Sequence, residues 1–151
     1  MDHLLAQDVQ FDIIGLSYYP FWHGPLADLR LTLTDLATRY GKDILIAETS
    51  YPWTLANGDR LDNFVTSAEQ LPEAERFPPT PEGQAAYFEA LRSLLLQVPK
   101  EHGIGYLAWE PAWLPGVGWR TGAGNQYDNL TMFGWDGVAL PSVRAFREKA
   151  A

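Results

Sequence analysis

Three short apolar runs along the chain predict buried strands. They extend from Phe11 to Ser17, from Ile44 to Ala47 and from Ile104 to Trp109, and they are rich in β-branched or aromatic residues. Each run is mostly continuous and does not alternate with polar residues. This pattern is typical of strands in a parallel sheet that is covered on both faces.

Apolar residues recur at helical spacing between these runs. One stripe extends from Leu26 to Tyr40, and Gly41 is expected to end that helix. A second helix is predicted to begin at Pro81, where proline suits the first helical position, and to stop before Pro99. Strand, helix, strand, helix and strand therefore follow one another along the chain.

The last predicted helix is short, beginning at Pro141 and carrying Val143 and Phe146 inward. Residues before Phe11 resemble the end of one more strand-helix unit. Repeated units of this kind predict an α/β fold with a parallel sheet and right-handed crossovers. No change in composition marks a boundary, so residues 1–151 are expected to form a single domain.

Two connections are long, from Thr49 to Pro79 and from Glu110 to Leu140. Both follow the C-terminal end of a predicted strand. Loops of this length in a small domain are often functional, and ligands of parallel α/β folds bind at this edge of the sheet. The sequence therefore places the candidate site in these two loops.

Composition narrows the classes of function. The chain has 151 residues, no cysteine, and 11 Lys and Arg against 19 Asp and Glu, a net charge of −8. This charge opposes binding to nucleic acid or to anionic membranes, and no apolar run reaches the roughly 18 residues that a membrane span needs. The acidic start of the chain is unlike a secretory signal.

Glu48 is the sharpest chemical feature. It ends an apolar strand beside Tyr51 and Trp53, where partial loss of solvent suits a nucleophile or a general base. The alternative is a structural glutamate paired with a Lys or Arg at the strand end.

Aromatic and polar residues gather where all three predicted strands end. Tyrosine hydroxyls and carboxylates can bind sugar hydroxyls while tryptophan faces stack on sugar rings. For each aromatic residue taken singly, packing in the core is the alternative. The candidate binding residues are Ser17, Tyr18, Tyr19, Trp22, His23, Trp53, Trp109, Glu110 and Trp113.

Oxygen-rich residues follow the second strand. Asp59 and Asp62, with Asn57 and Asn63, are weak candidates for calcium ligands, because their spacing departs from the EF-hand pattern and also suits a solvated turn. No other cofactor is expected.

Ordered motifs across nearly the whole chain resemble the arabinogalactan endo-β-1,4-galactanases of glycosyl hydrolase family 53. They are FDIIGLSYYPFWHG at 11–24, AET at 47–49, WEPAW at 109–113, DNLTMF at 128–133 and ALPS at 139–142. That family is a (β/α)8 barrel with retaining glycosidase chemistry. The resemblance implies a partial TIM barrel, with the three predicted strands as the sixth, seventh and eighth.

The resemblance also implies roles for single residues. Glu48 matches the nucleophile, and Trp109 the tryptophan beneath the sugar next to the cleaved bond. Tyr18 and Tyr19 belong to a motif that lines the cleft, and Asn129, a further candidate for substrate binding, lies in the family's motif of the eighth loop. The loop after the seventh strand binds calcium in some relatives, but the Asp-x-Asp-x-His pattern is missing here.

One required group is missing from the chain. The family's acid/base is the glutamate of an Asn-Glu pair on the fourth strand, and no Asn-Glu pair occurs in this sequence. The resemblance implies a secreted enzyme acting on galactan or arabinogalactan, and we expect this chain alone to be inactive. It should associate with itself or require the N-terminal part of a barrel. The alternatives are a carbohydrate-binding or assembly fragment without catalysis, and a related glycosidase for another β-linked polysaccharide.

Overall fold

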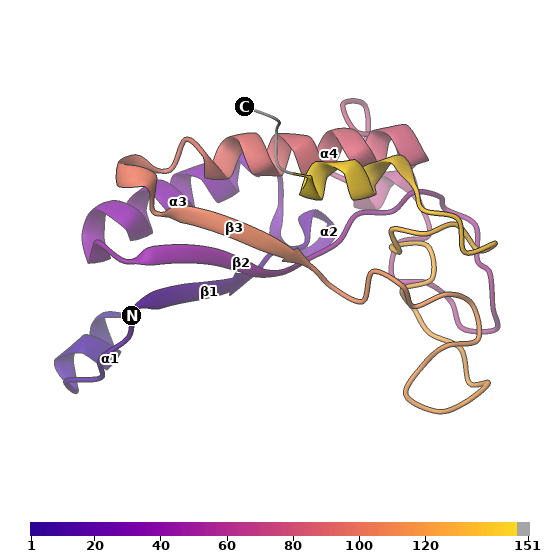
Figure 1. Cartoon of the computed structure of the whole chain (residues 1–151), viewed down its shortest axis with the longest axis horizontal. Coiled ribbons are helices and arrows are strands. Elements are labelled where there is room, and N and C mark those ends of the chain that lie inside the picture. The colour runs from indigo at the N-terminus through magenta and orange to yellow at the C-terminus, as the bar shows by residue number, and fades with distance from the viewer. Residues whose placement is uncertain (148–151) are drawn as a thin grey trace.

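Three parallel strands organise the chain (Figure 1). In the computed structural model, which describes residues 1–147, β1 spans Ile13–Ser17, β2 spans Asp43–Thr49 and β3 spans Gly103–Ala108. Their order in the sheet is β1-β2-β3, and both pairs are parallel. The three predicted strands are confirmed, with bounds that differ by one or two residues.

Two long helices cover one face of this sheet. They are α3, Leu26–Tyr40, and α4, Pro81–Leu95. Helix α3 ends as predicted at Gly41, which adopts the left-handed conformation with φ 57°. At the start of α4, the hydroxyl of Thr80 accepts a 3.0 Å hydrogen bond from the Gly83 backbone N–H.

Short elements complete the fold. They are α1 (Asp2–Ala6), α2 (Pro20–His23) and the 3₁₀ turns η1 (Ala68–Gln70), η2 (Pro99–Glu101) and η3 (Pro141–Phe146). The last predicted helix is therefore a 3₁₀ helix, and α2 is a turn that the pattern did not predict.

The inward direction predicted for Phe146 is confirmed only in part. Its ring packs against Tyr106 at 4.8 Å between centroids, but 45% of the residue stays exposed. Val143 is partly buried against the core, as predicted. Among the described residues β3 is an outer strand of the sheet, so no neighbouring strand covers Phe146 at this end of η3.

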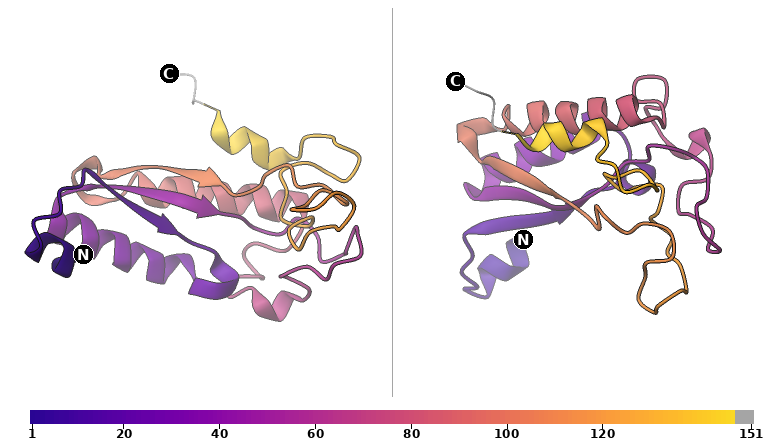
Figure 2. Two further views of the ribbon diagram at one scale, coloured as in Figure 1. Left: turned by 90° about the horizontal axis from the view of Figure 1, so that it is seen from below. Right: turned by 45° about the vertical axis from the view of Figure 1, so that its right-hand side comes forward.

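The core lies between the sheet and the two helices. Ile44 and Ile46 of β2 are fully buried against Leu33 of α3 and against Phe88 and Leu91 of α4. Within residues 1–147, neither long helix lies on the opposite face of the sheet, as the view from below shows (Figure 2). The two long helices therefore cover one face and leave the other open.

Large apolar side chains of the edge strands remain exposed. Ile13 of β1 is 47% exposed, and Ile104 and Leu107 of β3 are 47% and 54% exposed. Both outer strands are edges that could pair with further strands. This arrangement is an α/β fold consistent with part of a larger barrel.

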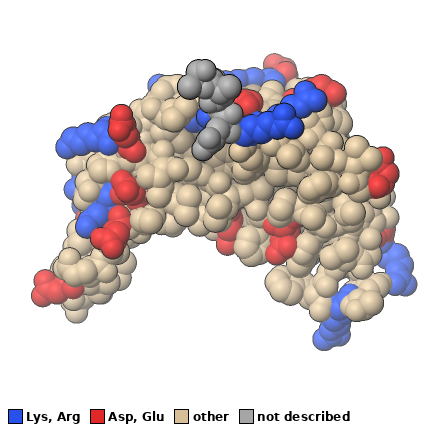
Figure 3. All heavy atoms as spheres, viewed as in Figure 1, with Lys and Arg blue, Asp and Glu red and all other residues tan. Residues whose placement is uncertain are grey.

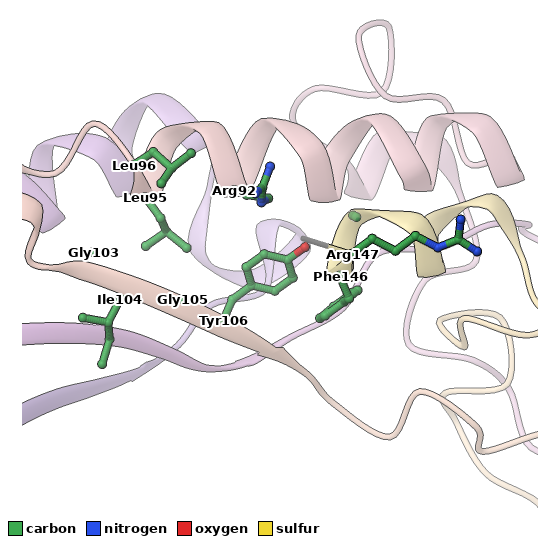
Figure 4. A pocket seen from close by; sticks show the side chains of 10 residues that line it. Arg92, Leu95, Leu96, Gly103, Ile104, Gly105, Tyr106, Phe146 and Arg147 are labelled. Carbon is green, nitrogen blue, oxygen red and sulfur yellow. The ribbon is translucent and has the colours of Figure 1, made fainter. Parts of the chain in front are cut away.

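A cavity of about 330 Å³ lies along the free edge of β3, between α4 and η3 (Figure 4). Its lining includes Leu95, Leu96, Ile104, Tyr106 and Phe146. The Tyr106 ring stacks on Phe88 of α4 at 5.7 Å. The cavity contains none of the predicted site residues, so it is a consequence of the open sheet edge and not the candidate site.

Candidate functional site

A β-bulge in β2 sets the direction of Glu48. Leu16 of β1 pairs with Ile46, whereas the next residue of β1 pairs with Glu48, so β2 contains one extra residue. Ile46 and Thr49 are both fully buried, and the Thr49 hydroxyl lies 3.0 Å from the Tyr87 hydroxyl of α4. Because neighbouring side chains of a strand point to opposite faces, Glu48 lies on the open face of the sheet.

Tyr19 contacts this carboxylate directly. Its hydroxyl donates a 3.1 Å hydrogen bond to Oε2 of Glu48. Tyr19 is 3% exposed, and its burial together with the hydrogen bond to Glu48 raises the pKa of its hydroxyl well above the ordinary value. Tyr19 therefore stays protonated and remains a hydrogen-bond donor to the carboxylate.

Backbone contacts fix the two strand ends beside each other. The Tyr18 N–H donates to the Glu48 carbonyl at 2.8 Å, and the Trp109 N–H donates to the Thr49 carbonyl at 2.8 Å. All three predicted strand tips therefore lie side by side, as expected for the carboxyl edge of a parallel sheet.

The other polar residues of the β1 tip support the turn that carries Tyr19. Tyr18 is buried, and its hydroxyl donates to the Gly24 carbonyl at 2.7 Å. Nδ1 of His23 accepts a 2.9 Å hydrogen bond from the Tyr19 N–H. Tyr19 rather than Tyr18 thus points toward the carboxylate, and the position of Tyr18 does not fit the predicted contact with substrate. Ser17 is exposed at the end of β1.

Glu110 turns the chain away from β3. Its backbone is in the left-handed region, with φ 43°, which is uncommon for a non-glycine residue. Its charge helps to raise the pKa values of Tyr19 and Tyr127, although burial is the larger cause for each tyrosine. For Tyr127 a hydrogen bond with the Trp109 side chain opposes this effect. Glu110, Trp109 and Tyr127 therefore share one region with Glu48.

Aromatic rings continue from this region across all three connecting loops. Trp22 packs edge to face on Phe64 at 5.1 Å, and Phe64 on Tyr127 at 5.0 Å. Trp113 then lies 6.0 Å from Tyr127 and 5.0 Å from Trp119. We call these five residues the aromatic row. Trp22 and Trp119 at its ends are 51% and 83% exposed, so the row offers accessible faces for a flat ligand.

Three members of the aromatic row were missed in the sequence. Phe64, Tyr127 and Trp119 lie in the long loops, where no periodicity predicts the direction of a side chain. The only available signal was the aromatic content of those loops.

Two predicted binding residues lie elsewhere. Asn129 is fully buried, and its Nδ2 donates to the carbonyls of Val65 and Thr54 at 2.7 and 3.1 Å, so it joins loops and does not reach solvent. Trp53 is partly buried against Trp135. Both positions suit structural roles, because the Asn129 Nδ2 and the Trp53 indole N–H donate hydrogen bonds within the protein, the latter to the Thr131 hydroxyl at 3.2 Å.

The two aspartates named as weak calcium candidates, Asp59 and Asp62, have different surroundings. Asp59 accepts backbone hydrogen bonds from Leu61, Gly116 and Asn125 at 2.9, 3.1 and 2.9 Å. Burial acts to raise its pKa, but these three bonds hold the pKa below the ordinary value. Asp62 is exposed. Across residues 1–147, no group of three or more His, Cys, Asp or Glu side chains is placed to hold a metal ion.

The surface around the open face is concave. Figure 3 shows a hollow between the N-terminal segment and the loops, with acidic groups near its loop side. None of the described helices has both the length and the apolar character needed to cross a membrane.

Comparison with known proteins gives the family. The glycosyl hydrolase family 53 profile matches residues 1–146. A Niallia circulans protein, described as an uncharacterized protein in the bgaB 5′ region, is 45% identical over 147 residues, covering 97% of this chain and 40% of that protein. The arabinogalactan endo-β-1,4-galactanase of Cellvibrio japonicus is 38% identical over 128 residues, covering 83% of this chain and 32% of the enzyme.

A solved structure has the same fold. The Ignisphaera aggregans GH53 catalytic domain superposes with a TM-score of 0.88 at 38% identity, over 97% of this chain and 41% of that domain. The chain spans between about a third and about two fifths of the length of these relatives. The match over residues 1–146 and the shared fold show that this chain belongs to glycosyl hydrolase family 53.

Proposed function

We propose that this chain is the C-terminal part of a retaining endo-β-1,4-galactanase, with its strands as the sixth, seventh and eighth of a (β/α)8 barrel. The observation that carries the proposal is the hydrogen bond from Tyr19 to Glu48 at the carboxyl edge of the sheet. Family membership and the galactanase name of the Cellvibrio japonicus relative support the substrate class.

Glu48 suits the role of nucleophile. The bulge in β2 turns it to the open face, where an oxygen of its carboxylate could reach the anomeric carbon of a bound sugar. A tyrosine donor at 3.1 Å orients the carboxylate and stabilises its negative charge. This geometry favours direct attack by Glu48 over a structural ion pair.

The reaction would proceed in two displacements. One oxygen of Glu48 forms a bond to the anomeric carbon while the glycosidic C–O bond breaks, and an acid protonates the departing oxygen. Water then attacks the glycosyl-enzyme, gives its proton to the same acid/base and releases Glu48. The two carboxyl groups of a retaining glycosidase lie about 5 to 5.5 Å apart.

This chain would supply the nucleophile, and the rest of a barrel would supply the acid/base. The two free edges, β1 and β3, and the exposed residues Ile13, Ile104 and Leu107 support a requirement for further strands. The isolated chain is therefore expected to be inactive, because general acid/base catalysis is worth about 10²- to 10⁴-fold. The extracellular location expected from the family resemblance belongs to the same proposal.

The test joins this chain to the N-terminal part of its Niallia circulans relative. We expect the joined barrel to hydrolyse β-1,4-galactan and the 151-residue chain alone not to do so. A 2-fluoro-galactoside with a good leaving group should label Glu48, as read by peptide mass spectrometry. Glu48→Gln should abolish turnover, whereas Glu82→Gln, at an exposed position of α4, should leave it unchanged. Full turnover by Glu48→Gln, or a label on another residue, would refute the role of Glu48.

A binding function without catalysis is the second candidate. The aromatic row favours it, since Trp22 and Trp119 are accessible. Under this alternative the isolated chain binds galactan oligosaccharides, and the joined barrel binds them without cleaving them. Calorimetric titration beside the hydrolysis assay separates the two functions.

A further inference from the structure

Two aspartates, one in each long loop, accept hydrogen bonds from the other loop. The first loop, residues 50–80, follows β2 and is here called the β2 loop; the second, residues 109–140, follows β3 and is called the β3 loop. Asp59 of the β2 loop accepts hydrogen bonds through Oδ2 from Gly116 and Asn125 of the β3 loop, at 3.1 and 2.9 Å. The two loops are thus joined by charge-assisted hydrogen bonds.

Asp128 makes the reverse connection. It belongs to the β3 loop, is fully buried, and accepts hydrogen bonds from two groups of the β2 loop. These are Nδ2 of Asn63 at 2.7 Å and the Gly58 N–H at 3.0 Å. Gly58 and Asp59 are adjacent, so both connections meet at one point of the β2 loop.

The connection made by Asp59 continues inside the β3 loop. Asn125, whose N–H bonds Asp59, donates through Nδ2 to the carbonyls of Trp113, Leu114 and Val117 at 3.2, 3.1 and 2.8 Å. One amide group thereby closes the segment 113–125 into a ring. Asp59 accepts hydrogen bonds from two backbone N–H groups of this ring, and Trp113 and Trp119 lie within the ring.

The fit around Asp59 leaves no space for a side chain. A Cβ atom added at Gly124 would lie 2.5 Å from Oδ1 of Asp59, and the backbone there has φ 85°. A Cβ atom at Gly118 would lie 2.2 Å from the Gly124 carbonyl oxygen. The β3 loop therefore packs directly on the Asp59 carboxylate, and the contact is specific in shape as well as in charge.

We propose that Asp59 is a positioning residue that sets the place of Trp113 and Trp119 and thereby the affinity for the outer sugars of a long galactan chain. The proposal rests on the proposed function. Glu48 is held separately, by Tyr19 and by the strand ends, so loss of Asp59 should leave the contacts nearest the cleaved bond intact. The expected effect therefore depends on substrate length.

The test compares Asp59→Ala and Asp59→Asn with the matched control Asp62→Ala, an exposed carboxylate three residues further along the same loop. Calorimetry on the joined barrel, with Glu48→Gln as the common background that prevents cleavage, measures the dissociation constants of β-1,4-galactobiose and β-1,4-galactopentaose. Loss of these charge-assisted bonds should weaken pentaose binding by about tenfold in Asp59→Ala and leave biose binding unchanged. Asp59→Asn, which keeps one acceptor oxygen, should lose less, and Asp62→Ala should bind both like the wild type.

Indole N–H signals in NMR spectra give a second readout that does not need a ligand. Those of Trp113 and Trp119 should shift or broaden in Asp59→Ala, while that of Trp22 stays in place. Equal weakening for both sugars, or unchanged binding of both, would overturn the proposal. If the joined barrel with Asp59 intact binds neither sugar, the proposed function fails; unchanged Trp113 and Trp119 signals would then overturn the positioning role also. Asp59→Asn keeps the test valid if Asp59→Ala does not fold.

Discussion

The hydroxyl of Tyr19 donates a 3.1 Å hydrogen bond to Oε2 of Glu48, so a residue at the end of β1 orients a carboxylate of β2. The two residues are 29 positions apart in the sequence, with α3 between them. Their contact depends on the parallel pairing of β1 with β2 and on the bulge that turns Glu48 to the open face.

Replacing Tyr19 by phenylalanine should impair catalysis without unfolding the protein. In the joined barrel we expect kcat to fall by between about tenfold and about a hundredfold, because Glu48, the proposed nucleophile, loses its orienting donor. Tyr18→Phe is the matched control, since the Tyr18 hydroxyl bonds the Gly24 carbonyl instead. That change should cost about 1 kcal/mol of stability and leave kcat near the wild-type value. Unchanged kcat in Tyr19→Phe would contradict the assigned role.

Gln84 should be a determinant of stability. It is fully buried in α4, and its Nε2 donates to the carbonyls of Tyr51 and Thr131, each at 2.8 Å, while its Oε1 accepts from Ser142 at 2.6 Å. Gln84→Leu leaves these three groups without partners, so we expect the free energy of unfolding to fall by about 2 to 4 kcal/mol. Urea denaturation measures it. Gln97→Leu, at an exposed position, should change it little, and equal effects of the two substitutions would count against this account.

Asp128 should make stability depend on pH. Its burial raises the pKa of its carboxyl, although hydrogen bonds from Asn63 and Gly58 act in the opposite direction. Since the folded state favours the protonated form, the contribution of Asp128 is full below the ordinary aspartate pKa of about 3.9 and is lost as the pH rises toward the folded value.

Asp128→Asn should remove this dependence. The difference in unfolding free energy between the wild type and this variant, followed by urea denaturation from acid to neutral pH, should move in favour of the variant as the pH rises. Asp62→Asn serves as the control at an exposed site, with a difference that changes little. A constant difference for Asp128→Asn would show that folding does not perturb its titration.

The uncovered strands should cause self-association of the isolated chain. Leu107 is 54% exposed on β3, at a free edge of the sheet. We expect dimers or larger species in analytical ultracentrifugation, and a larger share of monomer after Leu107→Lys. Leu31→Lys is the matched control, because Leu31 is 66% exposed on α3, away from the strands. A monomeric wild-type chain at high concentration would refute the expectation.

Much of the fold could be predicted from local patterns. Continuous apolar runs identified the three strands, and helical spacing with Gly41 and Pro81 at the ends identified α3 and α4. These patterns are strong because each element must bury an apolar face, whatever its neighbours are. The position of Glu48 at a strand end follows from the same reasoning.

The direction of side chains in the site depended on tertiary structure. Simple alternation from Ile44 and Ile46 would place Glu48 beneath the helices, and only the bulge moves it to the open face. Tyr18 and Tyr19 are neighbours in sequence, yet one bonds the Gly24 carbonyl and the other bonds Glu48.

By itself, the sequence determined the α/β architecture, the edge of the sheet where the candidate site residues gather, and the presence of a glutamate at the end of the second strand. The tertiary structure decided which loop residues meet there. It joined Asp59 to Asn125 and buried Asn129, which the sequence had suggested as a binding residue. The physical reason is that loop residues are placed by hydrogen bonds between segments distant in sequence, and no local periodicity records those partners.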